Sequence, residues 1–260
     1  VCVGNIYVGG TGKTSLCIEI NNILKNEYKT VFIKKKYDYQ SDENELLKSQ
    51  GSLLNEKDRN ISLLKASNKE KYNLAILDDG LQEKKIKYNV SIACFNTTYG
   101  IGNGFLLPAG PLRENISSLK NYSAIFLNGE RKNKKLLEIL RKVNKNIFYS
   151  TYDPVNLQQF NRNKKYLCFC GIGNPEEFFN TLKKHKFNVS ETIIFPDHHS
   201  FKNEEINEIK RIATANKLEI ITTEKDFKRL KKNKKNIKYL KIKLKIKNKK
   251  KFINFLKEKI

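Results

Sequence analysis

The residues best suited to chemistry lie in a glycine-rich run near the start of the chain, Gly9-Gly10-Thr11-Gly12-Lys13-Thr14. Glycines let backbone N–H groups wrap around a phosphate chain, and a helix that follows adds the positive end of its dipole. Lys13 can reach the β- and γ-phosphates, and Thr14 can ligate Mg²⁺. A strict Walker A motif has glycine where this chain has Tyr7. The run still predicts a nucleotide-binding P-loop.

Two carboxylates, Asp78 and Asp79, come directly before Gly80 at the end of the apolar run 74–77. A continuous apolar run is typical of a parallel strand that is buried on both faces. The carboxyl end of such a strand beside a P-loop is where an aspartate holds Mg²⁺, directly or through water. Adjacent side chains of a strand point to opposite faces, so we expect one carboxylate to act and the other to support it. The two motifs predict a nucleoside triphosphate and Mg²⁺, and they leave the phosphoryl acceptor open.

These motifs need a framework in which strands end beside helix starts. The segment 14–26 has apolar residues at helical spacing, and 41–49 is also predicted to be helical. Strands are predicted at residues 1–3, 31–33, 74–77, 90–95 and 124–127. This alternation predicts an α/β class, with a P-loop NTPase-like, doubly wound and mostly parallel sheet. The Gly/Pro-rich loop 100–111 interrupts the pattern, and loops of that kind usually carry function.

A domain boundary is predicted where the chain turns polar and irregular, near residues 152–165. We expect residues 1–152 to form the nucleotide-binding domain and residues 153–260 a smaller α/β domain with a basic tail. The second domain opens with an apolar strand at 166–170, and Asn174-Pro175-Glu176-Glu177 has the residue types of a helix start. Later strands and a closing helix are predicted at 219–222, 241–247 and 251–260.

The chain is strongly basic, with 51 Lys and Arg against 27 Asp and Glu, a formal net charge of +24. Residues 225–260 alone hold 17 Lys and Arg against two acids. Such a tail can bind nucleic acid or an anionic membrane surface. A compositional bias that places Lys at any solvated position explains the same charge, and the excess of Lys over Arg favours it. We expect no nucleic-acid partner, and attraction to anionic lipid headgroups stays open.

The five cysteines have apolar neighbours and an odd number, which predicts reduced, buried thiols and no structural metal. No apolar run approaches the roughly 20 residues that a membrane-spanning helix needs. The chain starts at Val1, already in a strand-like run, and contains no Met. We therefore expect that a natural N-terminal segment precedes it, which could include a membrane anchor.

Longer segments around these motifs resemble one known family, the tetraacyldisaccharide 4′-kinases, which phosphorylate a lipid A precursor. The similar segments are 3–14, Asp78-Asp79-Gly80-Leu81-Gln82 and the block 102–114, Gly-Asn-Gly-Phe-Leu-Leu-Pro-Ala-Gly-Pro-Leu-Arg-Glu. A generic ATPase has no reason to carry the last of these. Further similar segments follow in the family's order at 171–175, 195–199 and 222–226, so the resemblance covers most of the chain.

The resemblance implies transfer of the γ-phosphoryl group of ATP, with Mg²⁺, to the 4′-hydroxyl of an acylated glucosamine disaccharide 1-phosphate. It implies catalytic roles for Lys13, for Asp42 as the base and for His198 as its partner. A sugar hydroxyl is a poor nucleophile, and a carboxylate paired with histidine can take its proton. The implied metal ligands are Thr14, Asp78 and Asp79, and the implied substrate contacts are Asn5, Tyr37, Arg113 and Glu114.

The resemblance also implies a peripheral position on the cytoplasmic face of the bacterial inner membrane, with an anionic membrane surface as a partner. It sets no oligomeric state and no acyl-chain specificity. The chain departs from the family pattern at Lys34-Lys35-Lys36-Tyr37, where the family has Ser-Arg-Gly-Tyr, and at Glu83, where the family has histidine. Lys35 keeps the charge of the arginine and loses its bidentate geometry.

Three other functions stay open at this point. A partitioning or metal-delivery ATPase also uses a Gly-Gly-x-Gly-Lys-Thr loop, but it has a signature lysine where this chain has Val8. A nucleic-acid-binding NTPase would explain the basic charge, yet no recognition helix or stacking platform is visible. The third alternative is a relative that binds nucleotide and does not catalyse. The partitioning or metal-delivery ATPase also gives no account of residues 102–114.

Overall fold

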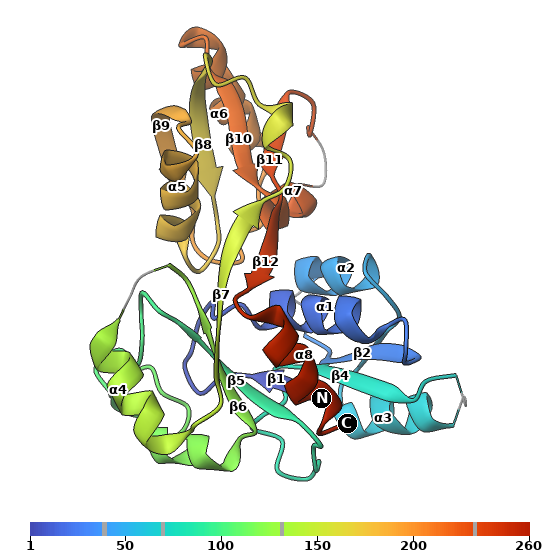
Figure 1. The fold of residues 1–260 in the computed structure, drawn as a ribbon. Helices are drawn as coiled ribbons and strands as arrows, with labels where there is room; N and C mark the ends of the chain where they lie inside the picture. The colour runs from blue at the N-terminus through green and yellow to red at the C-terminus, as the bar shows by residue number, and fades with distance from the viewer. Residues whose placement is uncertain (38–40, 69–70, 131–132, 231–232) are drawn as a thin grey trace. The chain divides into compact units, whose positions relative to one another are not determined.

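The structure is a computed structural model that describes residues 1–260 except 38–40, 69–70, 131–132 and 231–232, and except the side chains of 41–42. The chain divides into two compact units. The first contains residues 1–152 together with 244–260, and the second contains residues 153–243. Figure 1 shows the elements of each unit in chain order from blue to red.

The first unit is built on an eight-stranded sheet in the order β12-β7-β6-β5-β1-β4-β2-β3. The pairings from β3 through β7 are parallel. The strands are β1 (Cys2–Gly4), β2 (Thr30–Lys35), β3 (Leu53–Glu56), β4 (Leu74–Asp78), β5 (Ser91–Asn96), β6 (Ala124–Asn128), β7 (Ile147–Pro154) and β12 (Ile242–Ile246). The prediction of an α/β, mostly parallel sheet is confirmed. β3 was not predicted, because its four residues are only half-buried.

Helices cover both faces of this sheet, as a doubly wound fold requires. α1 (Lys13–Leu24), α2 (Ser41–Lys48) and α8 (Lys249–Lys257) contribute to one apolar cluster with one face of the central strands. α3 (Arg59–Ser67), the 3₁₀ helix η1 (Ile116–Asn121) and α4 (Lys134–Val143) pack on the other face. Parallel strands buried on both faces explain the continuous apolar runs in β4, β5 and β6.

The end of the chain corrects the domain prediction, because residues 244–260 belong to the first unit and not to a domain over 153–260. β12 adds to the edge of the large sheet beside β7, and Leu244 and Ile246 enter its core. Phe252 of α8 packs edge-on against Phe126 and Phe148. In Figure 1 the dark red α8 lies beside the blue α1, and Lys249 Nζ is 2.7 Å from Glu19 Oε1. Alternating apolar residues predicted the strand, but they could not tell which sheet it joins.

The second unit has a four-stranded parallel sheet in the order β11-β10-β8-β9. Its elements are the 3₁₀ helix η2 (Leu157–Gln159), β8 (Lys165–Cys170), α5 (Pro175–Lys184), β9 (Asn188–Ile194), α6 (Asn203–Ala215), β10 (Glu219–Thr223), α7 (Glu224–Arg229) and β11 (Ile237–Leu240). The helix start predicted at Asn174 is present, because the Asn174 side chain accepts a hydrogen bond from the Glu177 N–H. Two apolar clusters form its core.

All five cysteines are buried and unpaired, as predicted. Burial raises the pKa of Cys2, Cys168 and Cys170 to about 12, which keeps these thiols protonated. Among the described helices, none is long and apolar enough to cross a bilayer.

Candidate active site

The glycine-rich run joins the end of β1 to the start of α1. Gly12 is the N-cap of α1 with a left-handed φ of 84°, and a Cβ at this position would overlap the Tyr152 hydroxyl and the Asn128 amide. Only glycine fits here without strain. No side chain caps α1, so the backbone N–H groups of its first turn remain available to an anion.

Two buried asparagines hold the loop from outside the motif. Asn5 Nδ2 donates to Thr11 Oγ1 at 3.0 Å and to the Gly9 carbonyl at 3.4 Å. Asn128 Nδ2 donates to the Thr11 carbonyl at 2.5 Å, and its own carbonyl accepts from the Ser150 hydroxyl. Asn5 is fully buried. The Asn5 amide nitrogen therefore braces the P-loop, and the contact of Asn5 with the substrate stays a prediction.

The P-loop and the aspartates of β4 lie together. β1 pairs with β4 in the sheet, and Thr14 Oγ1 donates to Asp78 Oδ2 at 3.0 Å. Asp78 is fully buried, and its second oxygen, Oδ1, has no hydrogen-bond partner among the described residues. A buried carboxylate oxygen without a partner is costly unless a ligand satisfies it. The tip of β4 therefore has the buried oxygen that a cation site beside the phosphates requires.

No role was predicted for Lys34, yet it is the cation of a buried cluster with Thr14, Asp78 and Glu43, which we call the buried edge. It lies at the end of β2 directly opposite Asp78, and its Nζ is 2.7 Å from Asp78 Oδ2 and 2.6 Å from Glu43 Oε2. Burial lowers the pKa of Lys34, but the charges and hydrogen bonds of Asp78 and Glu43 outweigh burial and raise it above its ordinary value. Lys34 thus stays charged and links β2, β4 and the first turn of α2.

The side chain of Asp79 pairs with Lys13 and Arg113 and not with the residues around Asp78. Its φ of 58° is left-handed, and its carboxylate is 3.8 Å from Lys13 Nζ and 3.2 Å from Arg113 Nη1. Arg59 Nη2 donates to the Asp79 carbonyl at 2.5 Å. Burial raises the pKa of Asp79, but the charges of Lys13, Arg113 and Lys34 outweigh burial and hold it below its ordinary value. Asp79 is therefore ionised at neutral pH and holds two cations at the edge of the P-loop.

Arg113 and Glu114 reach the site through the loop that precedes them. The Arg113 N–H donates to the Ile6 carbonyl at 2.7 Å, and the Val8 N–H donates to the Pro111 carbonyl at 2.9 Å. Glu114 accepts from Gln82 at 2.8 Å and from the Tyr122 hydroxyl at 2.7 Å. These two backbone hydrogen bonds therefore join the end of the segment 102–114 to residues 6–8, which lead from β1 to the P-loop.

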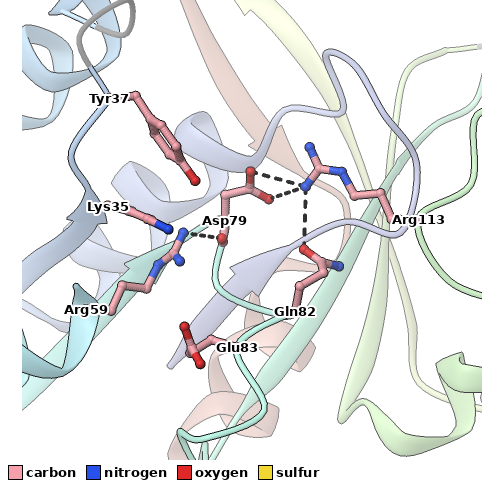
Figure 2. A pocket seen from close by; sticks show the side chains of 7 residues that line it. All are labelled: Lys35, Tyr37, Arg59, Asp79, Gln82, Glu83 and Arg113. Carbon is pink, nitrogen blue, oxygen red and sulfur yellow. Dashed lines mark hydrogen bonds and ion pairs between the residues drawn. The ribbon is translucent and has the colours of Figure 1, made fainter. Parts of the chain in front are cut away.

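Asp79 and Arg113 line a cleft of about 350 Å³. Figure 2 shows Asp79 at its centre, bonded to Arg113 on one side and facing Lys35 and Tyr37 on the other. The cleft is lined by Lys35, Tyr37, Arg59, Asp79, Gln82, Glu83 and Arg113. Three cations against two carboxylates favour an anionic ligand, and an arginine fork suits a phosphate or carboxylate group.

The structure describes the side chain of His198, the predicted partner, but only the backbone of Asp42, the predicted base. Asp42 lies in the first turn of α2, and its side chain lies outside the described residues. His198 belongs to the second unit, has a φ of 60°, and its Nδ1 is 3.4 Å from Arg229 Nη2. Arg229 also pairs with the buried Asp226 at 2.9 Å. The pairing of Asp42 with His198 stays a prediction.

The residues at the tip of β4 fit a magnesium ion. Mg²⁺ prefers oxygen ligands and is often held by one or two carboxylates plus substrate phosphates. Thr14 Oγ1 and the partnerless Asp78 Oδ1 are ligands of that kind. The Asp79 carboxylate pairs with Lys13 and Arg113, and its role as a metal ligand stays a prediction. Within the described ranges, no group of three or more His, Cys, Asp or Glu side chains could hold a metal ion alone. A metal here would therefore depend on a bound phosphate chain.

The fold and the site define an α/β protein with a P-loop, a buried aspartate at the neighbouring strand end and a cationic cleft beside both. Comparison with known proteins identifies the family. The model described as tetraacyldisaccharide-1-P 4′-kinase, LpxK, matches residues 1–58 and 37–260. The chain belongs to this family.

Individual relatives agree with the family model. A protein named tetraacyldisaccharide 4′-kinase from Pelagibacter ubique is 44% identical over 98% of this chain and 83% of its own length. The protein of the same name from Rickettsia bellii is 33% identical over 95% of this chain and 82% of its own. A crystal structure of LpxK from Aquifex aeolicus in complex with ATP shares the fold, with a TM-score of 0.74, 23% identity and coverage of 99% of this chain and 87% of that one.

Proposed function

We propose that this protein is an ATP-dependent kinase that transfers the γ-phosphoryl group to the 4′-hydroxyl of an acylated glucosamine disaccharide 1-phosphate. The observation that carries the proposal is the convergence of Lys13, Thr14 and Asp78 beside the Arg113 cleft in a member of the tetraacyldisaccharide 4′-kinase family. The Aquifex aeolicus relative was crystallised with ATP, which supports the same donor here.

The P-loop residues would divide the work of binding the donor. The amides of residues 9–14 and the open N-terminus of α1 would hold the phosphate chain, and Lys13 would neutralise its terminal phosphates. Thr14 and Asp78 would hold Mg²⁺, which supplies positive charge to the β- and γ-phosphate oxygens when bound. Because Asp79 is paired with Lys13 at 3.8 Å, it would position this lysine until the nucleotide takes over the contact.

The cleft would bind the acceptor. Arg113, Arg59 and Lys35 line it, and a phosphate monoester on the sugar would find charge-assisted hydrogen bonds there. Glu114 is positioned by Gln82 and Tyr122, so it would hold a sugar hydroxyl from a fixed side. Tyr37 forms part of the wall near Lys35 (Figure 2). The acceptor hydroxyl would then lie between the cleft and the terminal phosphate.

Asp42 is the proposed base and His198 its proposed partner. Both roles rest on the resemblance of the segments around these residues to the family pattern. Asp42 precedes Glu43 in α2, and the contact of Glu43 with Lys34 beside Asp78 supports the proposed position of Asp42 near the site. We also propose a peripheral position on the cytoplasmic face of the inner membrane, where a lipid acceptor would reside. The +24 net charge supports attraction to an anionic leaflet.

The reaction is tested with γ-labelled ATP, Mg²⁺ and the acylated disaccharide 1-phosphate dispersed in detergent, with the label followed onto the lipid. We expect transfer by the wild type and none by Lys13→Ala. If ATP is hydrolysed by the wild type and the lipid stays unlabelled, the kinase proposal is wrong and the ATPase alternative replaces it. Asp42→Asn and His198→Gln are expected to bind ATP normally and to lower kcat. If either keeps full kcat, that residue has no catalytic role.

A further inference from the structure

The loop that leads to Arg113 presents large apolar side chains to solvent. Residues 102–109 are all exposed, and within them Phe105 is 64% exposed and Leu107 56%. Val8, whose N–H bonds the Pro111 carbonyl, is 43% exposed beside them. We call residues 102–112 the apolar loop. Val8, Phe105 and Leu107 belong to none of the apolar core clusters, so core packing does not explain why these positions are apolar.

The apolar loop also lacks charge. Residues 96–112 contain no Asp, Glu, Lys or Arg, in a chain where 30% of all residues are charged. Exposed loops elsewhere in this protein are rich in Lys, so a bias toward Lys at solvated positions would have placed some here. A contiguous exposed apolar segment in a soluble protein indicates an interaction surface.

The loop is held rigid by its own hydrogen bonds. The Leu107 N–H donates to the Leu112 carbonyl at 2.8 Å, the Leu112 N–H to the Phe105 carbonyl at 3.1 Å, and the Gly110 N–H to the Leu106 carbonyl at 2.9 Å. Asn103 Nδ2 donates to the Ala109 carbonyl at 2.9 Å. Backbone groups that are satisfied internally can enter an apolar medium without the cost of a lost hydrogen bond.

The position of the loop relates it to the proposed reaction. Arg113, the next residue, lines the cleft, and Val8 leads into Gly9 of the P-loop. A surface that holds Phe105 and Leu107 would therefore lie next to the entrance of the acceptor site. If the acceptor is an acylated sugar, as proposed above, its head group lies at a bilayer surface with its acyl chains below.

We propose that the apolar loop inserts into the acyl-chain region of the leaflet that holds the lipid acceptor, and so brings the cleft to the level of the head groups. This inference rests on the proposed function. A bilayer suits the loop better than a protein partner, because the acceptor is itself anchored there and the +24 net charge complements anionic head groups. Phe and Leu on a charge-free loop have the composition that interfacial insertion requires.

Fluorescence can test insertion directly, because the chain contains no Trp. Phe105→Trp reports from the loop, and Leu64→Trp is a matched control on α3, where Leu64 is 62% exposed in the same unit. The probe is vesicles of phosphatidylglycerol and phosphatidylethanolamine. We expect a blue shift and protection from iodide for Phe105→Trp, quenching by lipids brominated on the acyl chains, and no change for Leu64→Trp.

Two results would overturn the inference in this assay. One is an unchanged Phe105→Trp spectrum when sedimentation shows the protein on the vesicles. The other is a blue shift that occurs without vesicles and grows with protein concentration, which would assign the loop to a second copy of the chain. Neither readout depends on catalysis, so the result stands whether or not the protein is a kinase.

Activity on two forms of the same lipid separates this inference from the proposed function. With the acceptor in vesicles, Phe105→Asp and Leu107→Asp are expected to lower the rate about tenfold, since binding scales with buried apolar area. In detergent micelles the loss is expected to be much smaller, and Leu64→Asp is the control in both. If the wild type labels no lipid in either form, the proposed function fails. If it labels vesicles and both Asp variants match it, insertion alone is wrong.

Discussion

Asp78 and Asp79 are neighbours in the sequence and lie in opposite surroundings in the structure. Asp78 is fully buried at the end of β4, where Thr14 and Lys34 bond the same carboxylate oxygen. Asp79 has a left-handed φ, and its side chain is 25% exposed in the cleft between Lys13 and Arg113. One unusual backbone angle therefore directs one carboxylate to the buried edge and the next to the open cleft.

The difference indicates two ways of holding functional groups. At the buried edge each polar group depends on a partner that water cannot replace, so losing one should reduce folding stability as well as function. In the cleft the groups meet solvent, so losing one should reduce function and leave the fold intact. Four substitutions test this contrast, from the largest expected effect to the smallest.

Lys34→Met should have the largest effect. It leaves Asp78 and Glu43 without the cation that lies 2.7 and 2.6 Å from them, and breaking a buried pair on one side costs about 3–5 kcal/mol. Urea or thermal unfolding measures this loss in the free energy of unfolding. Lys34→Met with Asp78→Asn removes the buried negative charge as well and should recover part of the stability. If Lys34→Met has the same free energy of unfolding as the wild type, the ion pairs of Lys34 do not stabilise the buried edge.

Lys34 also shows which features of the site local sequence motifs cannot predict. The P-loop and the end of β4 could be predicted, because each motif is local and a parallel sheet brings their ends together. The role of Lys34 depends on β2 being the neighbour of β4, which fixes Lys34 opposite Asp78. Strand order is a property of the whole sheet, and the residue types around Lys34 do not indicate it.

Other features that were not predicted from the sequence have the same origin. The hydrogen bonds from the Asn5 amide to Gly9 and Thr11 depend on how β1 meets the P-loop. Alternating residues at 241–247 predicted a strand, and only the edge of β7 decides that it joins the large sheet. Helices with a local cap signal, such as the one starting after Asn174, needed no such information.

Asn5→Ala should have the next effect. It removes the donor that holds Thr11 Oγ1 at 3.0 Å, and a lost buried hydrogen bond costs about 1–3 kcal/mol. We expect weaker ATP binding by calorimetry, together with a higher KM for ATP and an unchanged KM for the lipid. Asn128→Ala, which frees the Thr11 carbonyl on the other side, should give the same pattern. A raised KM for the lipid alone would instead support the predicted contact of Asn5 with the substrate.

Arg113→Lys should affect only the acceptor side. Lysine keeps the charge near Asp79 and loses the forked donors, so we expect kcat/KM for the lipid to fall about tenfold, or ~1.4 kcal/mol. ATP binding and the unfolding midpoint should match the wild type. Arg211→Lys is a matched control, because Arg211 is an exposed residue of α6 that pairs with Glu208 three residues away. If Arg113→Lys also lowers the unfolding midpoint, Arg113 contributes to folding stability as the residues of the buried edge do.

Asp79→Asn should give the smallest effect on stability, and this effect is present at neutral pH and disappears in acid. The pKa of Asp79 is below its ordinary value in the folded state, so its ionised form stabilises the fold above the unfolded pKa of about 4. That contribution is lost as the pH falls through the folded pKa. Because the side chain is a quarter exposed, we expect less than about 1 kcal/mol at neutral pH.

Thermal unfolding of wild type and Asp79→Asn at pH 7 and again near pH 3 measures this difference. We expect the two unfolding midpoints to converge as the pH falls, because the wild type loses the charge that the variant never had. A gap that stays constant with pH would show that Asp79 stabilises through its shape or its backbone angle. A gap that widens in acid would contradict the depressed pKa, and with it the view that Lys13 and Arg113 hold this carboxylate in its ionised form.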